Sequence, residues 1–158
     1  MGLDIFTLVH ILISLSGLLS GLVVVGGWIA GRHYPKLTAF FLVMTAATSI
    51  TGYFFPFQGF TPAFAVGAIS LVLLAVAAYA YYGAKRAGGW NKVYLFTALT
   101  ALYLNFFVLV AQLFQKTPAL KALAPNQTEP PFGIAQTLVL ALFVALGVAA
   151  FRGLRTAR

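Results

Sequence analysis

The sequence lacks cysteine and has very little charge. Of its 158 residues, 8% are charged and only two are acidic, whereas a typical soluble domain carries about 25% charged residues. The lack of cysteine excludes disulfides, thiolate metal sites, cysteine-ligated iron–sulfur clusters and CxxC redox chemistry. The scarcity of charge, together with 61% hydrophobic residues and a mean hydropathy of +0.96, predicts a surface that largely faces lipid.

Five long apolar runs predict an all-α bundle in a membrane. A spanning helix needs about 20 apolar residues, and the runs cover approximately residues 5–30, 37–55, 63–82, 93–114 and 134–151. Lipid offers the backbone no hydrogen-bond partner, so each run is expected to be helical. Runs such as LVLLAVAAYA lack the alternation of a membrane β-barrel strand. We expect residues 1–158 to form a single transmembrane domain of five helices.

The basic residues predict how this bundle is oriented. With the N-terminus outside and the C-terminus in the cytoplasm, eight of the ten basic residues are cytoplasmic, and only Lys116 and Lys121 are outside. The eight are Arg32, Lys36, Lys85, Arg86, Lys92, Arg152, Arg155 and Arg158. This is the bias expected of a membrane protein. The net charge of +8 is thereby explained without nucleic acid, and the lipid bilayer is the expected partner.

The expected spans contain no Asp, Glu, Lys or Arg in their interiors, which argues against a proton-coupled carrier. His10 is the titratable side chain expected just below the outer surface. It shares a helical stripe with Ser14, Gly17 and Gly21, and the small residues of that stripe allow close approach of another helix. His10 is therefore expected to face protein, either as an interhelical hydrogen-bonding group, as a haem or metal ligand, or as a proton- or substrate-binding group.

A haem held by this chain alone is not expected. The only other histidine, His33, follows His10 by 23 residues, which is about 35 Å along a helix. Two imidazoles at such different depths cannot ligate one iron, so haem would require a second chain. No metal site and no catalytic residue is predicted.

Polar side chains also line the second and fourth runs. Asn105 and Gln112 share one helical face of the fourth run with Thr97, and Thr45, Ser49 and Gly52 share a face of the second. One interpretation is helix–helix packing, for which we select Ser14, Gly17, Gly21, Thr45, Ser49 and Gly52. The other is an outward-facing polar pocket lined by His10, Tyr103, Asn105 and Gln112.

The ends of the runs suggest further local structure. Trp28 and Trp90 are interpreted as anchors at the inner membrane boundary. The stretch TPALKAL after the fourth run predicts a short interfacial helix. Pro130 and Pro131 predict an extended entry into the fifth run.

The stretches HILISLSGLLSGLVVVGGWIAG, TAFFLVMTAATSITGYFFPF and ALYLNFFVLVAQLFQKTPALKALAPNQTEPPFGIAQ resemble an uncharacterised family of small multi-pass bacterial inner-membrane proteins. The resemblance implies five spans in that membrane and supplies no activity, cofactor or site. The expected function is a non-enzymatic accessory or self-associating subunit, in a homo-oligomer or a larger membrane complex. The alternatives are a binding or transport module with an outward-facing pocket, and a redox protein that binds haem or quinone at His10.

Overall fold

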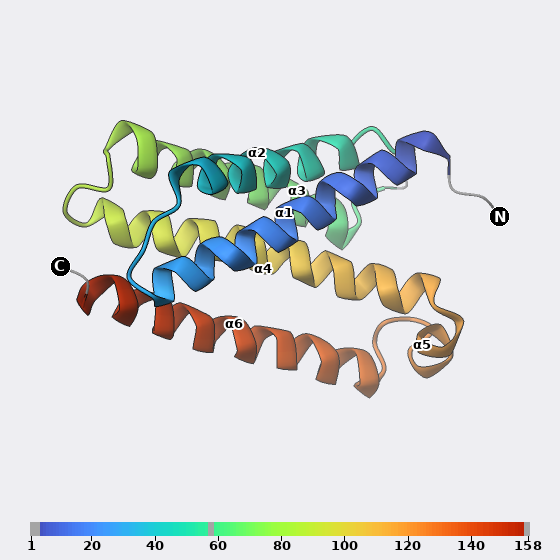
Figure 1. The fold of residues 1–158 in the computed structure, drawn as a ribbon. Helices are drawn as coiled ribbons and strands as arrows, with labels where there is room; N and C mark the ends of the chain where they lie inside the picture. The colour runs from blue at the N-terminus through green and yellow to red at the C-terminus, as the bar shows by residue number, and fades with distance from the viewer. Residues whose placement is uncertain (1–3, 57–58, 157–158) are drawn as a thin grey trace.

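A computed structural model describes residues 4–56 and 59–156, and these residues fold into helices without a strand among them (Figure 1). The all-α prediction is therefore confirmed. The helices are α1 (Ile5–Ile29), α2 (Pro35–Gly52), α3 (Pro62–Ala78), which continues as the π-helical turn η1 (Tyr79–Gly83), α4 (Trp90–Lys116), α5 (Pro118–Leu123) and α6 (Pro130–Thr156).

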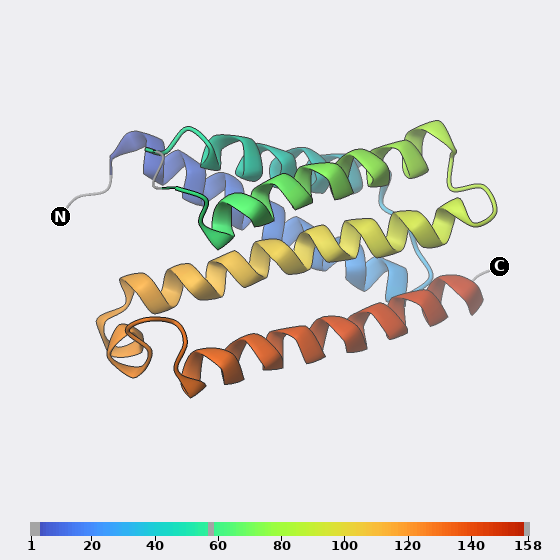
Figure 2. The same cartoon turned by 180° about the vertical axis from the view of Figure 1, so that it is seen from behind.

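α1 and α4 form the centre of the bundle. α1 packs against α2, α4 and α6, and α4 additionally packs against α3. Figure 1 and Figure 2 show α3 and α6 on either side of α4, at two edges of the bundle. These edge helices have one face on the core and leave the rest of their surface exposed.

Proline and short polar side chains set where the helices begin. α2, α3, α5 and α6 each begin on a proline, which suits the first helical turn because its fixed φ is already helical and its missing N–H would have no partner there. Asp4 caps α1 by accepting a hydrogen bond from the backbone N–H of Thr7 at 2.6 Å. The extended entry expected at Pro130 and Pro131 is wrong, since both residues lie in the first turn of α6.

The core is built where small residues let helices approach. A Cβ on Gly21 of α1 would lie 2.6 Å from Cδ1 of Leu102 in α4 and 2.8 Å from Cε1 of Phe41 in α2. Leu102 and Phe41 are both fully buried. Gly21 therefore marks the place where α1, α2 and α4 meet.

Within the described residues, four helices are long and apolar enough to span a membrane: Ile5–Ile29, Pro62–Gly83, Trp90–Lys116 and Pro130–Arg155. The five spans expected from the sequence are thus not confirmed, because α2 is not among the four. α2 has 18 residues and begins with Pro35 and Lys36. It also contains several hydroxyl side chains, which lower its hydropathy.

The two ends of the bundle differ in charge. The beginning of α1 and the end of α6 lie at opposite ends (Figure 1). The end that holds the α1–α2 turn, the α3–α4 turn and the last turns of α6 carries most of the basic side chains. Asp4 and Glu129, the only acidic residues of the chain, lie at the other end with Lys116 and Lys121.

Candidate functional site

His10 lies in α1 and contacts the end of α2. Its Nδ1 is 2.7 Å from Oγ1 of Thr51, and its ring meets that of Phe55 edge-on with 5.1 Å between centroids. The Thr51 hydroxyl already donates to the carbonyl of Ala47 at 2.7 Å. The imidazole must therefore donate from Nδ1 to Thr51, which leaves Nε2 as the acceptor of the ring.

Asn105 is buried between α4 and α1, with 8% of its surface exposed. Its Oδ1 accepts a hydrogen bond from the hydroxyl of Ser14 at 3.4 Å, and Ser14 lies one turn from His10 on α1. The Nδ2 of Asn105 has no hydrogen-bond partner among the described residues. The structure thus brings Asn105 together with the His10 side of α1 through a long interhelical hydrogen bond.

Tyr103 and Gln112 do not complete a pocket around Asn105. Tyr103 packs against Phe143 of α6 with 5.6 Å between ring centroids, whereas Asn105 faces α1. Residues two apart on a helix point in nearly opposite directions, about 200° apart. Gln112 shares the face of Asn105 but lies two turns along, about 10 Å away. Two open hollows on the surface, one on α6 and one at the α1–α2 turn, have none of these four residues in their walls.

The histidines and acidic residues are dispersed. No three His, Asp or Glu side chains gather within the described ranges 4–56 and 59–156. His10 lies near the start of α1, whereas His33 follows the end of α1 in the α1–α2 turn, so the two histidines lie at opposite ends of this helix.

The small residues selected for helix packing lie mainly between α1 and α2. A Cβ on Gly17 would come within 3.2 Å of Oγ1 of Thr45, and a Cβ on Gly52 within 3.8 Å of Cε1 of His10. Ser49 is half-buried on α2. Gly17 is buried by α2, and Gly21 is buried by α2 and α4. The row of small residues on α1 is therefore already covered by helices of the same chain. Another chain would have to use a different surface.

A second polar cluster lies at the basic end of the bundle. Trp28 is fully buried and meets Tyr94 of α4 edge-on, with 5.4 Å between centroids. The interpretation of Trp28 as a boundary anchor is therefore wrong, whereas Trp90 is exposed and packs on Tyr79. The sequence does carry the signal, because Trp28 continues the helical stripe of Gly17, Gly21 and Val24 that faces the core.

Arg86 joins this cluster from the α3–α4 turn. Its Nη1 donates to Nε2 of His33 at 2.7 Å, and its guanidinium lies 5.2 Å from the ring centroid of Tyr81. Lys85 and Arg86 have φ values of 52° and 56°, which are uncommon for residues with a Cβ. This backbone directs Arg86 towards His33 and so links the α1–α2 turn to the α3–α4 turn.

The interior of the cluster retains unused hydrogen-bonding capacity. The side chains of Trp28 and Thr38 lie beside the hydroxyl of Tyr94. Four buried polar atoms have no hydrogen-bond partner among the described residues: Trp28 Nε1, His33 Nδ1, Thr38 Oγ1 and the Tyr94 hydroxyl. Buried polar atoms are normally paired, and this cluster holds four of the seven buried side-chain atoms without a hydrogen-bond partner in the described part of the chain.

His33 is expected to make the protein less stable in mild acid. Burial, and then the nearby Arg86 guanidinium, lower the pKa of His33 from 6.5 to about 4. Between these values the unfolded chain binds a proton that the folded protein does not, so stability falls as the pH drops. Thermal unfolding is measured in detergent at about pH 7.5 and at about pH 5. The midpoint temperature of unfolding should fall more between these two pH values for the wild type than for His33→Gln. Equal drops would contradict this assignment.

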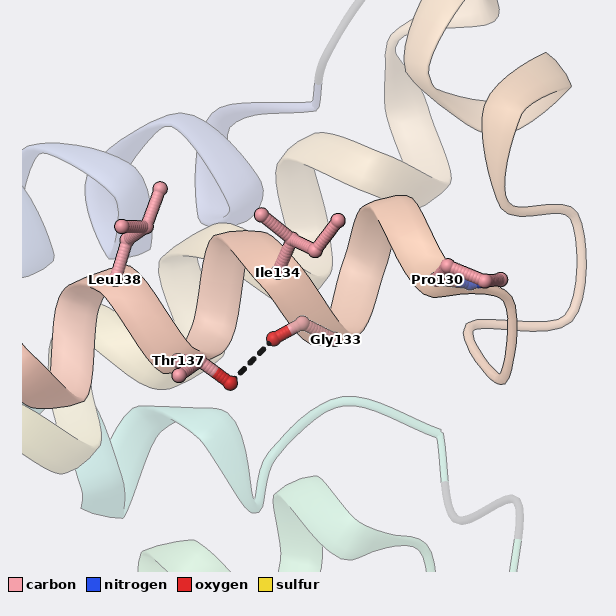
Figure 3. Close-up of a pocket in the computed structure, with 5 residues that line it drawn as sticks. All are labelled: Pro130, Gly133, Ile134, Thr137 and Leu138. Carbon is pink, nitrogen blue, oxygen red and sulfur yellow. Dashed lines mark hydrogen bonds between the residues drawn. The ribbon is translucent and has the colours of Figure 1, made fainter.

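The outer face of α6 carries a row of small side chains. Gly133, Thr137, Ala141 and Ala145 recur at every fourth residue and are all exposed. The first half of the row borders an open hollow of about 370 Å³ (Figure 3). Its lining residues are Pro130, Gly133, Ile134, Thr137 and Leu138. The Thr137 hydroxyl donates to the carbonyl of Gly133 at 2.7 Å and is therefore satisfied within the helix.

The opposite face of α6 holds it in the bundle. Gln136 Nε2 donates to the carbonyl of Phe107 in α4 at 3.0 Å, and Phe143 is buried against Tyr103. These contacts fix which side of α6 faces outwards.

No protein-family model matches the chain, and no curated protein or solved structure is similar to it.

Proposed function

We propose that the chain is a non-enzymatic, self-associating subunit of the bacterial inner membrane. The observation that carries this proposal is the outward-facing row of Gly133, Thr137, Ala141 and Ala145 on α6. In lipid there is no hydrophobic drive between helices, so association depends on close packing, and small residues at every fourth position permit it. The larger side chains beside the row, including Ile134 and Leu138, form ridges that a second helix can fit between.

The position of α6 supports this use. α6 lies at an edge of the bundle, with its core face fixed on α4 and α1. The comparable small row on α1 is covered by α2 and α4 through Gly17 and Gly21. Among these two rows of small residues, the one on α6 is open to another chain.

The multi-pass arrangement that we propose includes α2 as a fifth span. α2 returns along α1 from the basic end to the other end, and these two helices make the most extensive contact of the bundle (Figure 1). Three of its hydroxyls are satisfied within the helix, since Thr45, Thr48 and Thr51 donate to the carbonyls four residues earlier at 2.7–2.8 Å. Such bonding lowers the cost of hydroxyl groups in lipid.

The proposed orientation places the N-terminus outside and the basic end in the cytoplasm. Five crossings would put the start of α1 and the end of α6 on opposite sides, and these two helix ends lie at opposite ends of the bundle (Figure 2). The excess of Lys and Arg at one end favours that end for the cytoplasm.

A non-enzymatic role is supported by what the polar side chains of the spans do. The hydroxyl of Ser14 joins α1 to α4 through Asn105, and the amide of Gln136 joins α6 to α4. His10 joins α1 to α2 through Thr51. Each of these groups connects helices, which is a packing role.

Filling the row on α6 is expected to weaken association. Ala141→Leu and Ala145→Leu place bulky side chains where a second helix must approach, and each should weaken the oligomer about ten-fold. Native mass spectrometry in a mild detergent, over a dilution series, measures the ratio of oligomer to monomer. The matched control is Ala75→Leu, which makes the same change at an exposed position of α3.

The Ala75→Leu control distinguishes association through the face of α6 from a general effect of adding a bulky side chain at an exposed position. If Ala75→Leu weakens the oligomer as much as Ala141→Leu, the association does not use α6. A wild-type protein that stays monomeric at every concentration in native lipid would refute the self-associating role.

A further inference from the structure

An open hollow of about 610 Å³ lies where α1 turns into α2, lined by Val23, Tyr34, Pro35, Lys36 and Leu37. Its wall is almost entirely apolar, and one of the lining residues, Lys36, carries a positive charge. It lies at the basic end of the bundle, beside the turn between α1 and α2. An apolar wall beside a cation is complementary to an amphipathic anion.

The wall of this hollow is held in place by the ring of Tyr34, which packs closely on the backbone of Gly27. Gly31, with φ of 74°, reverses the chain after α1, and the ring of Tyr34 then packs over Gly27. A Cβ on Gly27 would lie 2.7 Å from Cε2 of Tyr34. Tyr34 is thereby held one helical turn beyond Val23, and the hollow forms between α1 and the start of α2.

The charges around the hollow are not balanced by acidic side chains. Asp4 and Glu129 lie at the other end of the bundle, where Asp4 caps α1 and Glu129 accepts from the backbone N–H of Asn126. Lys36 in the first turn of α2 is exposed, and Arg32 in the preceding α1–α2 turn is exposed as well. The local potential is therefore positive, and a bound anion would balance it.

We propose that this hollow is a binding site for an anionic phospholipid of the surrounding membrane. The phosphate lies at the ammonium of Lys36 with the guanidinium of Arg32 beside it, and an acyl chain follows Val23 and Leu37. A free phosphate would leave the apolar wall in water, so the amphipathic lipid is the occupant that matches the whole hollow. This site goes beyond self-association, because it uses α1 and α2 and is separate from the outer row of α6.

Lipid retention by the purified protein tests the site. The delipidated protein is incubated with phosphatidylglycerol or phosphatidylcholine in a mild detergent, and bound lipid is counted by native mass spectrometry. We expect phosphatidylglycerol to be retained preferentially, and Lys36→Gln to lower its retention about five-fold. Lys92→Gln is the matched control, since it removes the same charge from an exposed position at the same end of the bundle, outside the hollow.

A second variant tests the apolar wall without changing charge. Val23→Trp fills the hollow at an exposed position, so it should also lower retention of phosphatidylglycerol while the thermal unfolding of the lipid-free protein stays unchanged. The site is refuted if Lys92→Gln and Lys36→Gln have equal effects, because the attraction would then be general. It is also refuted if Val23→Trp retains lipid normally, or if inorganic phosphate displaces the lipid.

Discussion

Replacing Gly153 with alanine is expected to destabilise the bundle strongly. A Cβ at this position of α6 would fall on the carbonyl oxygens of Trp28 and Ile29 at the end of α1. These are backbone atoms, so they cannot rotate away as a flexible side chain can. α6 would have to move away from α1, and overpacking of this kind costs about 1–3 kcal/mol. Neighbouring Leu154, which is buried, would lose contacts in the same movement.

Unfolding of the purified protein by heat or by sodium dodecyl sulfate measures this effect. The matched control is Gly26→Ala, because a Cβ on Gly26 would meet nothing within 4 Å. Alanine is favoured over glycine in a helix by about 0.5–1 kcal/mol, so the control should be as stable as the wild type or slightly more stable. Equal stability of the two variants would show that α6 does not approach α1 so closely.

The helices themselves could be predicted from the sequence because lipid offers the backbone no hydrogen-bond partner. An apolar run in lipid must therefore form its hydrogen bonds within itself, as a helix does. The apolar runs locate the bodies of the helices, but hydropathy does not locate their ends. α6 begins at Pro130 and not at Ile134, since proline is accepted in the first helical turn. It also continues past Phe151, where the apolar run ends, and this places Gly153 in a contact between α6 and α1.

The candidate sites were harder to predict, for a geometric reason. Helical periodicity tells which residues share a face, so His10, Ser14 and Gly17 could be grouped on one face of the first helix. It does not tell which neighbour that face meets. The predicted pocket combined Tyr103 with Asn105, but α4 has α6 on one side and α1 on the other. Tyr103 faces α6, whereas Asn105 faces α1.

Helical periodicity cannot predict a contact between two turns. His33 and Arg86 are 53 residues apart and belong to two different turns. Their contact depends on left-handed backbone at Lys85 and Arg86 and on the π-helical turn Tyr79–Gly83 before them. Neither residue type favours that backbone, so the sequence gives no local signal for it.

Site-directed labelling is expected to give an all-or-none result for the proposed topology. The natural chain has no cysteine, so a single introduced cysteine is the only reactive thiol. With five spans and the N-terminus outside, Asn126→Cys should react with a membrane-impermeant maleimide in intact cells. Ala30→Cys and Ala87→Cys should react only after the membrane is permeabilised. All three positions are exposed at turns between helices.

The three positions together separate the alternatives because each crossing reverses the side of everything after it. If α2 does not cross while the N-terminus stays outside, position 30 remains inside, but position 87 moves outside and position 126 moves inside. If five helices cross in the opposite orientation, positions 30 and 87 are outside and position 126 is inside. Protection of position 30 with labelling of position 87 would therefore refute α2 as a span. Labelling of both would refute the orientation, and with it the assignment of the basic end to the cytoplasm.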